Sequence, residues 1–323
     1  MNLADLGLEP LGADLARVEA RLHEGVDHDD AFLGDVATHL VGAGGKRLRP
    51  ALGLTAFYAA TGLHPASDGA VTGATAVELV HLGSLYHDDV IDEAETRRGV
   101  PSVNARWSNI VAILAGDFLL ARASAFAASL GADVAALLAD TIGELCRGQV
   151  LELQHLFDVA RTEESYFSAI EGKTATLMAT ACRIGAMVAG VGPSTLDALT
   201  RFGMHLGMCF QVVDDVLDLT ATDEALGKRA GKDLVEGVYT LPVIAALRDT
   251  PALHALLGRP LPLDALDDVR GLVLADGAAD AALDVARSHA TKAGEALAGT
   301  DGLDPVVCEA LHCLVEGLVD RDF

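Results

Sequence analysis

Two short segments of this chain carry the same arrangement of three aspartates. The first reads HDDVID over residues 87–92, and the second reads VDDVLD over residues 213–218. On a helix, residues four apart project from one face, so each segment places its first and last aspartate side by side. Carboxylates at such short range repel one another unless a cation lies between them, and oxygen ligands suit hard ions such as Mg²⁺. The pattern predicts two carboxylate sets that bind divalent metal.

A solvated acidic helix face is the simpler explanation for one such segment in an acidic protein. Apolar residues precede both segments, however, over residues 79–85 and 210–213. Acidic side chains that are buried without a partner are strongly destabilising. The flanking residues therefore favour metal binding over a solvated face.

Basic residues are scarce in this chain, yet they gather in three short segments. These read GGKRLRP over residues 44–50, RR at 97–98, and GKRAGKD over residues 227–233. Magnesium is usually held by a few carboxylates together with substrate phosphates. Glycine lets the backbone approach an anion closely, and the forked guanidinium of Arg suits phosphate oxygens. Each cluster alone would be ordinary surface charge, but the three together predict a polyphosphate substrate.

The remaining sequence predicts helices that position these groups. Apolar residues recur at steps of three and four through residues 70–92, 110–130 and 133–157, whereas alternating strand patterns are hard to find. Glycine and proline interrupt the pattern near residues 42–45, 61–65, 99–101, 190–193 and 258–260. No long polar linker or repeat divides the chain. We expect one all-α domain over residues 1–323.

Composition excludes several classes of function. The 323 residues are 51% hydrophobic and 22% charged, which supplies a large core, and the net charge of −24 repels nucleic acid and anionic membranes. The N-terminus lacks the features of a signal peptide, and no segment predicts a transmembrane helix. Five cysteines are scattered without zinc-ligand spacing, as in proteins of a reducing compartment. The expected location is the cytoplasm.

Taken in order, the motifs resemble those of the trans-isoprenyl (polyprenyl) diphosphate synthases over residues 41–247. The resemblance is carried by seven segments, which read GGKRLRP, VELVHLGSLYHDDVIDEAETRRG, AGDFLLARA, EGKTATL, FQVVDDVLD, LGKRAGKD and EGVYTLPVI. It implies a single-domain isoprenoid synthase helical bundle with a central active-site cavity. It also implies a magnesium-dependent prenyltransferase that condenses isopentenyl diphosphate with an allylic diphosphate to an all-trans polyprenyl diphosphate.

The resemblance assigns roles to individual residues. Magnesium, in a cluster of three ions when diphosphate is bound, would be held by the aspartates of both segments, namely Asp88, Asp89, Asp92, Asp214, Asp215 and Asp218. The residues implied to hold isopentenyl diphosphate are Lys46, Arg49, His81 and Arg98. Those implied to contact the allylic substrate are Arg97, Lys173, Thr174, Gln211 and Lys228, with Lys232 as an additional candidate. Direct catalytic roles fall to Asp88, Asp89, Asp92, Lys173, Asp214, Asp215 and Lys228.

Two other functions share part of this pattern. A class I terpene cyclase also has an aspartate-rich first motif, but its second motif mixes residue types and it has no use for GGKRLRP. A non-catalytic subunit of a heteromeric synthase tends to lose an acidic or basic motif, whereas this chain keeps them all. Val238 stands where many relatives have Lys or Asn, and Tyr86 stands where Leu is common. The resemblance and the plentiful apolar helix faces predict a homodimer.

Product length is expected to depend on Gly83 and Ser84, which precede Asp88 by five and four residues. At ~1.5 Å of rise per residue they lie roughly 6 to 7.5 Å deeper along the helix, where a growing prenyl tail would run. Both side chains are small, which leaves the pocket open and favours a product longer than C20. A short-chain farnesyl or geranylgeranyl diphosphate synthase is the alternative, with Gly83 and Ser84 serving close helix packing instead.

Overall fold

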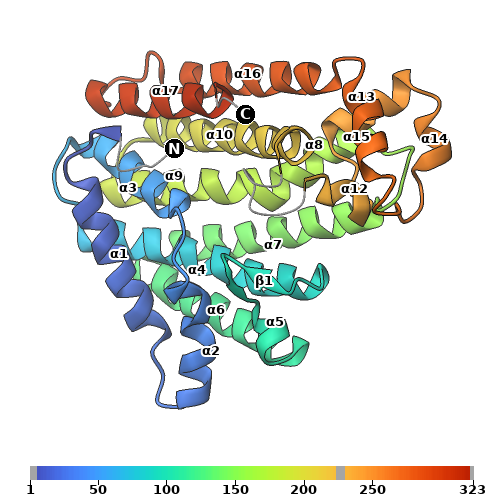
Figure 1. Cartoon of the computed structure of the whole chain (residues 1–323). Coiled ribbons are helices and arrows are strands. Elements are labelled where there is room, and N and C mark those ends of the chain that lie inside the picture. The colour runs from blue at the N-terminus through green and yellow to red at the C-terminus, as the bar shows by residue number, and fades with distance from the viewer. Residues whose placement is uncertain (1–5, 223–229, 321–323) are drawn as a thin grey trace. The chain divides into compact units, whose positions relative to one another are not determined.

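The computed structural model describes residues 6–222 and 230–320, and most of these are helical (Figure 1). The predicted all-α fold is confirmed. The chain divides into two compact units that each combine distant segments. Unit 1 comprises Met1–Ile142, Leu177–Gly203 and Gly299–Leu311, and unit 2 comprises Gly143–Thr176, Met204–Ala298 and His312–Phe323. The expectation of one domain stays a prediction.

Unit 1 is organised around one central helix. Its helices are α1 (Leu11–Val26), α2 (Ala31–Gly42), α3 (Leu48–Thr61), α4 (Asp68–Ile91), α5 (Val103–Arg106), α6 (Asn109–Ser129) and most of α9 (Thr176–Ala189). Helix α4 packs against α1, α3 and α6, and it is buried on nearly all sides over its first four turns. A helix that is apolar all round must be surrounded by others, which is why α4 forms the core.

Glycines set how closely these helices approach. A Cβ atom added to Gly185 of α9 would lie 2.1 Å from the carbonyl oxygen of Gly53 in α3. A Cβ added to Gly83 of α4 would lie 3.1 Å from the carbonyl oxygen of Gly116 in α6. Both distances are shorter than ordinary van der Waals contact, so the backbones touch because no side chain intervenes.

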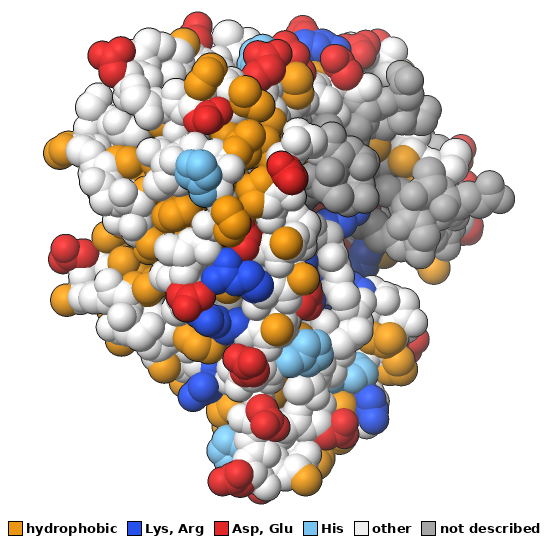
Figure 2. Space-filling model, turned by 90° about the vertical axis from the view of Figure 1, so that its left-hand side faces the viewer, with side chains coloured by type: hydrophobic (Ala, Val, Ile, Leu, Met, Phe, Trp, Pro, Cys, Tyr) orange, Lys and Arg blue, Asp and Glu red, His pale blue; other side chains and the backbone are white. Residues whose placement is uncertain are grey.

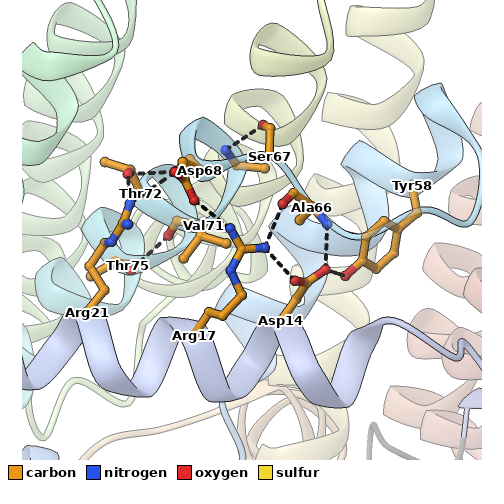
Figure 3. Close-up of polar contacts among 11 residues, drawn as sticks. Asp14, Arg17, Arg21, Tyr58, Ala66, Ser67, Asp68, Val71, Thr72 and Thr75 are labelled. Atoms are coloured by element: carbon orange, nitrogen blue, oxygen red, sulfur yellow. Dashed lines mark hydrogen bonds and ion pairs between the residues drawn. The ribbon is translucent and has the colours of Figure 1, made fainter.

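Helix α1 is fastened to unit 1 by a buried carboxylate (Figure 3). Asp14 accepts hydrogen bonds from the hydroxyl of Tyr58 at 2.6 Å and from the backbone amide of Ala66 at 2.6 Å. Arg17 of the same helix donates to Asp14 at 2.7 Å and to the carbonyl oxygen of Ala66 at 2.6 Å. These bonds satisfy the buried charge, so α1 is fixed by polar contacts as well as by its apolar face.

A small hairpin follows α4, and the apolar pattern did not predict strands there. Strands β1 (Thr96–Arg97) and β2 (Val100–Pro101) pair antiparallel, with Arg97 opposite Val100. The two connecting residues, Arg98 and Gly99, have φ angles of 54° and 77°. Positive φ at both positions is the geometry of a tight two-residue hairpin turn. The basic pair therefore spans the end of β1, at Arg97, and the turn, at Arg98.

Unit 2 is arranged around α13 (Leu241–Asp249), which packs against α8, α15 and α16. The helices other than α13 are α8 (Glu163–Ile170), the π-helical turn η2 (Glu171–Ala175), α12 (Lys232–Glu236), α14 (Leu253–Leu256), α15 (Leu266–Leu274) and α16 (Ala278–Leu297). Three long helices have residues in both units, namely α7 (Ala132–Gln154), α10 (Pro193–Thr220) and α17 (Pro305–Val319). The predicted helices at residues 70–92, 110–130 and 133–157 correspond to α4, α6 and α7.

Helix α6 exposes much of its apolar surface. Ile110 and Leu114 are 71% and 61% exposed. Within the described residues α6 is the one helix long and apolar enough to cross a membrane, and only 33% of its most apolar window is buried. Figure 2 shows a face of the molecule on which acidic side chains are scattered among hydrophobic ones, while basic side chains are fewer.

Candidate functional site

The first aspartate segment ends α4, and its three carboxylates lie in different surroundings. Asp88 is half-buried, Asp89 is buried, and Asp92 is exposed at the C-cap. Arg97 of the hairpin holds Asp89, with its Nε and Nη2 atoms 2.7 Å and 2.5 Å from the same carboxylate oxygen. Asp89 therefore holds Arg97 in place. Asp88 and Asp92 have solvent-accessible side chains that could bind a metal ion.

The basic loop before α3 surrounds the second arginine of the hairpin. Arg98 donates a hydrogen bond to the carbonyl oxygen of Gly44. A Cβ added to Gly45 would lie 2.8 Å from the guanidinium carbon of Arg98, so only glycine admits this approach. The Nε atom of Arg49 is buried and lacks a hydrogen-bond partner among the residues that the structure describes. A buried donor without a partner is costly, which indicates a ligand or water at this place.

His81 lies among these cations. Burial, followed by the positive charges of Arg49 and Arg98, lowers the pKa of His81 well below its usual value. Its imidazole is therefore neutral near pH 7 and donates from one nitrogen. Unit 1 thus brings together three of the four residues predicted to hold isopentenyl diphosphate, and the fourth, Lys46, is exposed on the same loop.

Arg47 has a structural role that the motif GGKRLRP did not predict. It is buried with a φ of 48°, and its guanidinium pairs with Glu19 of α1 and with Glu78 of α4, the latter at 2.9 Å. Burial raises the pKa of Glu78, while the charges of Arg47 and Arg49 oppose that shift. The pair of Arg47 and Glu78 anchors the basic loop to α4 one turn before His81.

The second aspartate segment lies in α10, and again the middle carboxylate faces inward. Asp214 is exposed, whereas Asp215 is only 4% exposed. Asp215 accepts a hydrogen bond from the Tyr166 hydroxyl at 2.5 Å on one oxygen and from the Gln211 amide at 2.8 Å on the other. Burial raises the pKa of Asp215 to about 7, although both donors oppose that shift. Asp218 is also buried and accepts from the backbone amide of Asp233 at 3.2 Å.

Lys173 and Thr174 lie on the π-helical turn η2, a geometry that recurs at functional sites. Its backbone touches α7, because a Cβ added to Gly148 would lie 2.4 Å from the backbone nitrogen of Lys173. Lys173 pairs with Glu152 of α7 at 2.6 Å, and Thr174 donates to the Gln211 side-chain oxygen at 2.7 Å. Unit 2 thus brings together three residues predicted to contact the allylic substrate.

The other predicted residues have varied surroundings. Lys232 pairs with Glu236 on α12 at 2.9 Å, and Lys228 lies outside the described residues.

The residues of α4 before Asp88 have different partners. Ser84 is half-buried and donates to the carbonyl oxygen of His81 at 2.8 Å. Gly83 faces α6, which agrees with the alternative that this glycine serves close helix packing. Tyr86 donates to the carbonyl oxygen of Val36 in α2 at 2.8 Å.

The carboxylates fit magnesium by their chemistry and their exposure. Across residues 6–222 and 230–320, no group of three or more acidic, histidine or cysteine side chains is assembled as a metal site. Magnesium does not require one, since it commonly takes one or two carboxylates and completes its shell with water and substrate phosphates. Asp88, Asp92 and Asp214 are the carboxylates with accessible surface.

Comparison with known proteins agrees with these features. A family model described as polyprenyl synthetase matches residues 30–262. The chain is 38% identical to the nonaprenyl diphosphate synthase of Mycobacterium tuberculosis, over 88% of this chain and 86% of that protein. It is 44% identical to the heptaprenyl diphosphate synthase component 2 of Geobacillus stearothermophilus, over 74% of each protein.

A solved structure matches nearly the whole chain. It is the geranylgeranyl pyrophosphate synthase of Corynebacterium glutamicum complexed with calcium and isoprenyl diphosphate. The two chains are 42% identical and superpose with a TM-score of 0.83 over 96% of each. Together with the matching family model, this likeness shows that the chain belongs to the polyprenyl synthetase family, as its motifs predicted.

Proposed function

We propose that this chain, a prenyltransferase, condenses isopentenyl diphosphate with an allylic diphosphate and makes an all-trans polyprenyl diphosphate longer than C20. One observation carries the proposal: each unit holds an aspartate segment together with residues suited to a diphosphate. In unit 1 burial lowers the pKa of Arg49, while the negative charges of Glu78 and Asp88 oppose that shift. In unit 2 the chain of hydrogen bonds from Thr174 through Gln211 ends on Asp215.

The residues act by binding and by electrostatic stabilisation. Lys46, Arg49 and Arg98 bind the diphosphate of isopentenyl diphosphate, to which neutral His81 donates a hydrogen bond. The accessible aspartates of each segment would hold magnesium, which would supply positive charge to a diphosphate leaving group. In unit 2, Lys173 would supply a positive charge to a bound diphosphate in place of its ion pair with Glu152.

The reaction needs no protein nucleophile. The allylic carbon–oxygen bond breaks, and its electron pair leaves with the diphosphate. The isopentenyl double bond then attacks the allylic cation to form the new carbon–carbon bond. Loss of a proton from the resulting cation to the released diphosphate restores a double bond. The protein contributes orientation and a fixed electrostatic environment to these steps.

The names of similar proteins bear on product length. Two relatives are named as nonaprenyl and heptaprenyl diphosphate synthases, whereas a similar solved structure is a geranylgeranyl pyrophosphate synthase. The small side chain of Ser84 supports the longer product. Gly83 packs against α6, so close helix packing also explains why glycine stands at this position, and Gly83 alone does not indicate an open pocket.

The exposed face of α6 supports a homodimer. Phe32 of α2 is exposed near this face, and a groove of about 300 Å³ between the two helices is lined by Phe32, Leu33, Val111 and Leu114. An apolar surface of this kind on a soluble monomer favours association. A second copy of the chain would cover it in both subunits at once.

The proposal is tested by incubating the pure protein with magnesium, isopentenyl diphosphate and each allylic starter, and by sizing the products by mass spectrometry. We expect products beyond C20, and no turnover in excess chelator. Asp88→Ala and Asp214→Ala should each lower kcat by orders of magnitude without changing the circular dichroism spectrum. Asp140→Ala, which removes an exposed carboxylate of α7, should keep full activity. Full activity in chelator would disprove metal dependence.

A further inference from the structure

We infer that Tyr166 is a positioning residue for the second aspartate segment, which it holds in place through Asp215. The inference rests on the proposed function and adds to it a residue outside the seven segments that carry the family resemblance. Tyr166 lies on α8, is 1% exposed, and contacts α10 through its hydroxyl group.

The carboxylate of Asp215 is held on both oxygens. The Tyr166 hydroxyl donates to one oxygen at 2.5 Å, and the Gln211 amide donates to the other at 2.8 Å. Gln211 precedes Asp215 by one helical turn, so its bond lies along α10, whereas the bond from Tyr166 comes from another helix. Two donors from different directions fix the carboxylate in one rotamer, and the adjacent Asp214 stays on the exposed side of α10.

The same hydrogen bonds connect Asp215 to the residues predicted to contact the allylic substrate. Thr174 donates to the Gln211 oxygen at 2.7 Å, which turns the Gln211 amide nitrogen toward Asp215. The order of donation is therefore Thr174 to Gln211 to Asp215, and Tyr166 completes the chain from the opposite side. Within unit 2, these hydrogen bonds connect α8 directly, and η2 through Gln211, to the Asp215 carboxylate of α10.

The Tyr166 ring is itself held from two sides. The guanidinium carbon of Arg161 lies 5.7 Å from the ring centroid, and the ring of Phe167 meets it edge-on at 5.3 Å. Arg161 is 5% exposed and donates to the carbonyl oxygen of Tyr239 at 2.9 Å. A buried guanidinium in a polar contact of this kind resists displacement, so the ring that it covers has little freedom to move.

Unit 1 contains a buried tyrosine that donates to an aspartate outside any predicted site, and it serves as a comparison for Tyr166. Tyr58 is buried and donates to Asp14 at 2.6 Å, which closely matches the bond from Tyr166 to Asp215 at 2.5 Å. Asp14 belongs to α1 and to no predicted site. The two tyrosines therefore form a matched pair, in which one bond fastens a helix and the other fastens the second aspartate segment.

The test compares Tyr166→Phe with Tyr58→Phe, since each change removes a single hydroxyl group from a buried tyrosine–aspartate bond. The unfolding temperature of each protein is followed while MgCl₂ is raised at a fixed concentration of inorganic diphosphate. This readout reports metal binding and does not depend on turnover. The kcat and KM for prenyl transfer are measured in parallel.

We expect both variants to unfold at lower temperature than the wild type, because each loses one buried hydrogen bond. Only Tyr166→Phe should need about 10- to 100-fold more magnesium for half of the stabilisation, the range typical when a hydrogen bond that orients a metal-binding segment is lost. Its kcat should fall more than its KM for isopentenyl diphosphate changes.

An unchanged magnesium requirement in Tyr166→Phe, or an equal change in both variants, would overturn the inference. So would a wild type that is not stabilised by magnesium and diphosphate. Failure of the proposed function gives a different result, namely a wild type that is stabilised by magnesium and diphosphate but transfers no prenyl group.

Discussion

At the scale of single residues, the aspartates of each segment divide into two kinds. Asp89 and Asp215 face inward and are held by Arg97 and by Tyr166 with Gln211, whereas Asp88 and Asp214 are more accessible. Helical periodicity predicts that adjacent aspartates differ in exposure, because adjacent residues on a helix point about 100° apart. It does not predict the burial of Asp218, which lies four residues after the exposed Asp214. The partners of the inward carboxylates could not be predicted, since they come from elements distant in sequence.

A pair of histidines in unit 2 should make stability depend on pH. The Nδ1 atoms of His205 and His289 lie 3.2 Å apart. Burial, followed by the positive charges of His205 and Lys292, lowers the pKa of His289 to about 4. The unfolded chain binds a proton at this histidine near pH 6.5 and the folded chain does not, so stability falls as pH decreases from about 6.5 to 4.

The measurement is the unfolding temperature of wild type and His289→Asn at pH 7 and pH 5. The variant should lose less stability between the two values, because it no longer has a group that is protonated only on unfolding. His23→Asn, which alters an exposed histidine of α1, should behave as the wild type does. Equal losses in wild type and His289→Asn would show that other groups govern the acid response.

At the scale of helices, the glycine contact between α3 and α9 should be essential to unit 1. A Cβ at Gly185 would lie 2.1 Å from the backbone oxygen of Gly53, and neither backbone can move without displacing its helix. We expect Gly185→Ala to lower the free energy of unfolding by about 3 kcal/mol, at the upper end for overpacking. Chemical denaturation measures this value.

Gly143→Ala is the matched control for that experiment. Gly143 lies on α7 and is exposed, and an added Cβ meets nothing within 4 Å. Alanine favours a helix more than glycine does, so this variant should be more stable by about 0.5–1 kcal/mol. Destabilisation of both variants by the same amount would mean that the contact at Gly185 has no special importance.

Product length should respond to Ser84 on α4. Ser84→Phe places a ring one helical turn before Asp88, where it would obstruct the growing tail and leave the diphosphate sites unchanged. We expect shorter products with the first condensation preserved, and unchanged products from Ser84→Ala. Gly83→Phe is less informative, because its ring would collide with Gly116 and Leu120 of α6. Wild-type length in Ser84→Phe, measured by mass spectrometry, would exclude this position from length control.

The sequence predicted the long helices well and the short elements poorly. Helices α4, α6 and α7 follow from apolar periodicity, which extends over enough residues to be unambiguous. The hairpin at Arg98 and the π-helical turn at Lys173 did not follow from it. Each is a few residues long and depends on distant contacts, such as Gly45 against Arg98 and Gly148 against η2. These short elements orient the predicted substrate residues, so the motifs located the site but not its geometry.

At the scale of the whole molecule, composition indicated a large core but not which apolar surface stays uncovered. The apolar pattern of α6 resembles that of a core helix, and only the structure shows that Ile110 and Leu114 are largely exposed. Electrostatic repulsion between two copies of so acidic a chain opposes association. A dimer must therefore gain enough apolar burial to exceed that repulsion.

Light scattering should accordingly give twice the monomer mass of 33.4 kDa for the wild type. Leu114→Glu places a charge in the middle of the exposed face of α6, where a partner subunit would have to bury it without a counter-charge, so the variant should dissociate. Val306→Glu changes a similarly exposed apolar residue on α17 and should leave the dimer intact.

Because association is weakened by charge repulsion, added salt should strengthen the wild-type dimer by screening that repulsion. A monomeric wild type that is fully active would show that the uncovered face of α6 serves some purpose other than pairing of two copies.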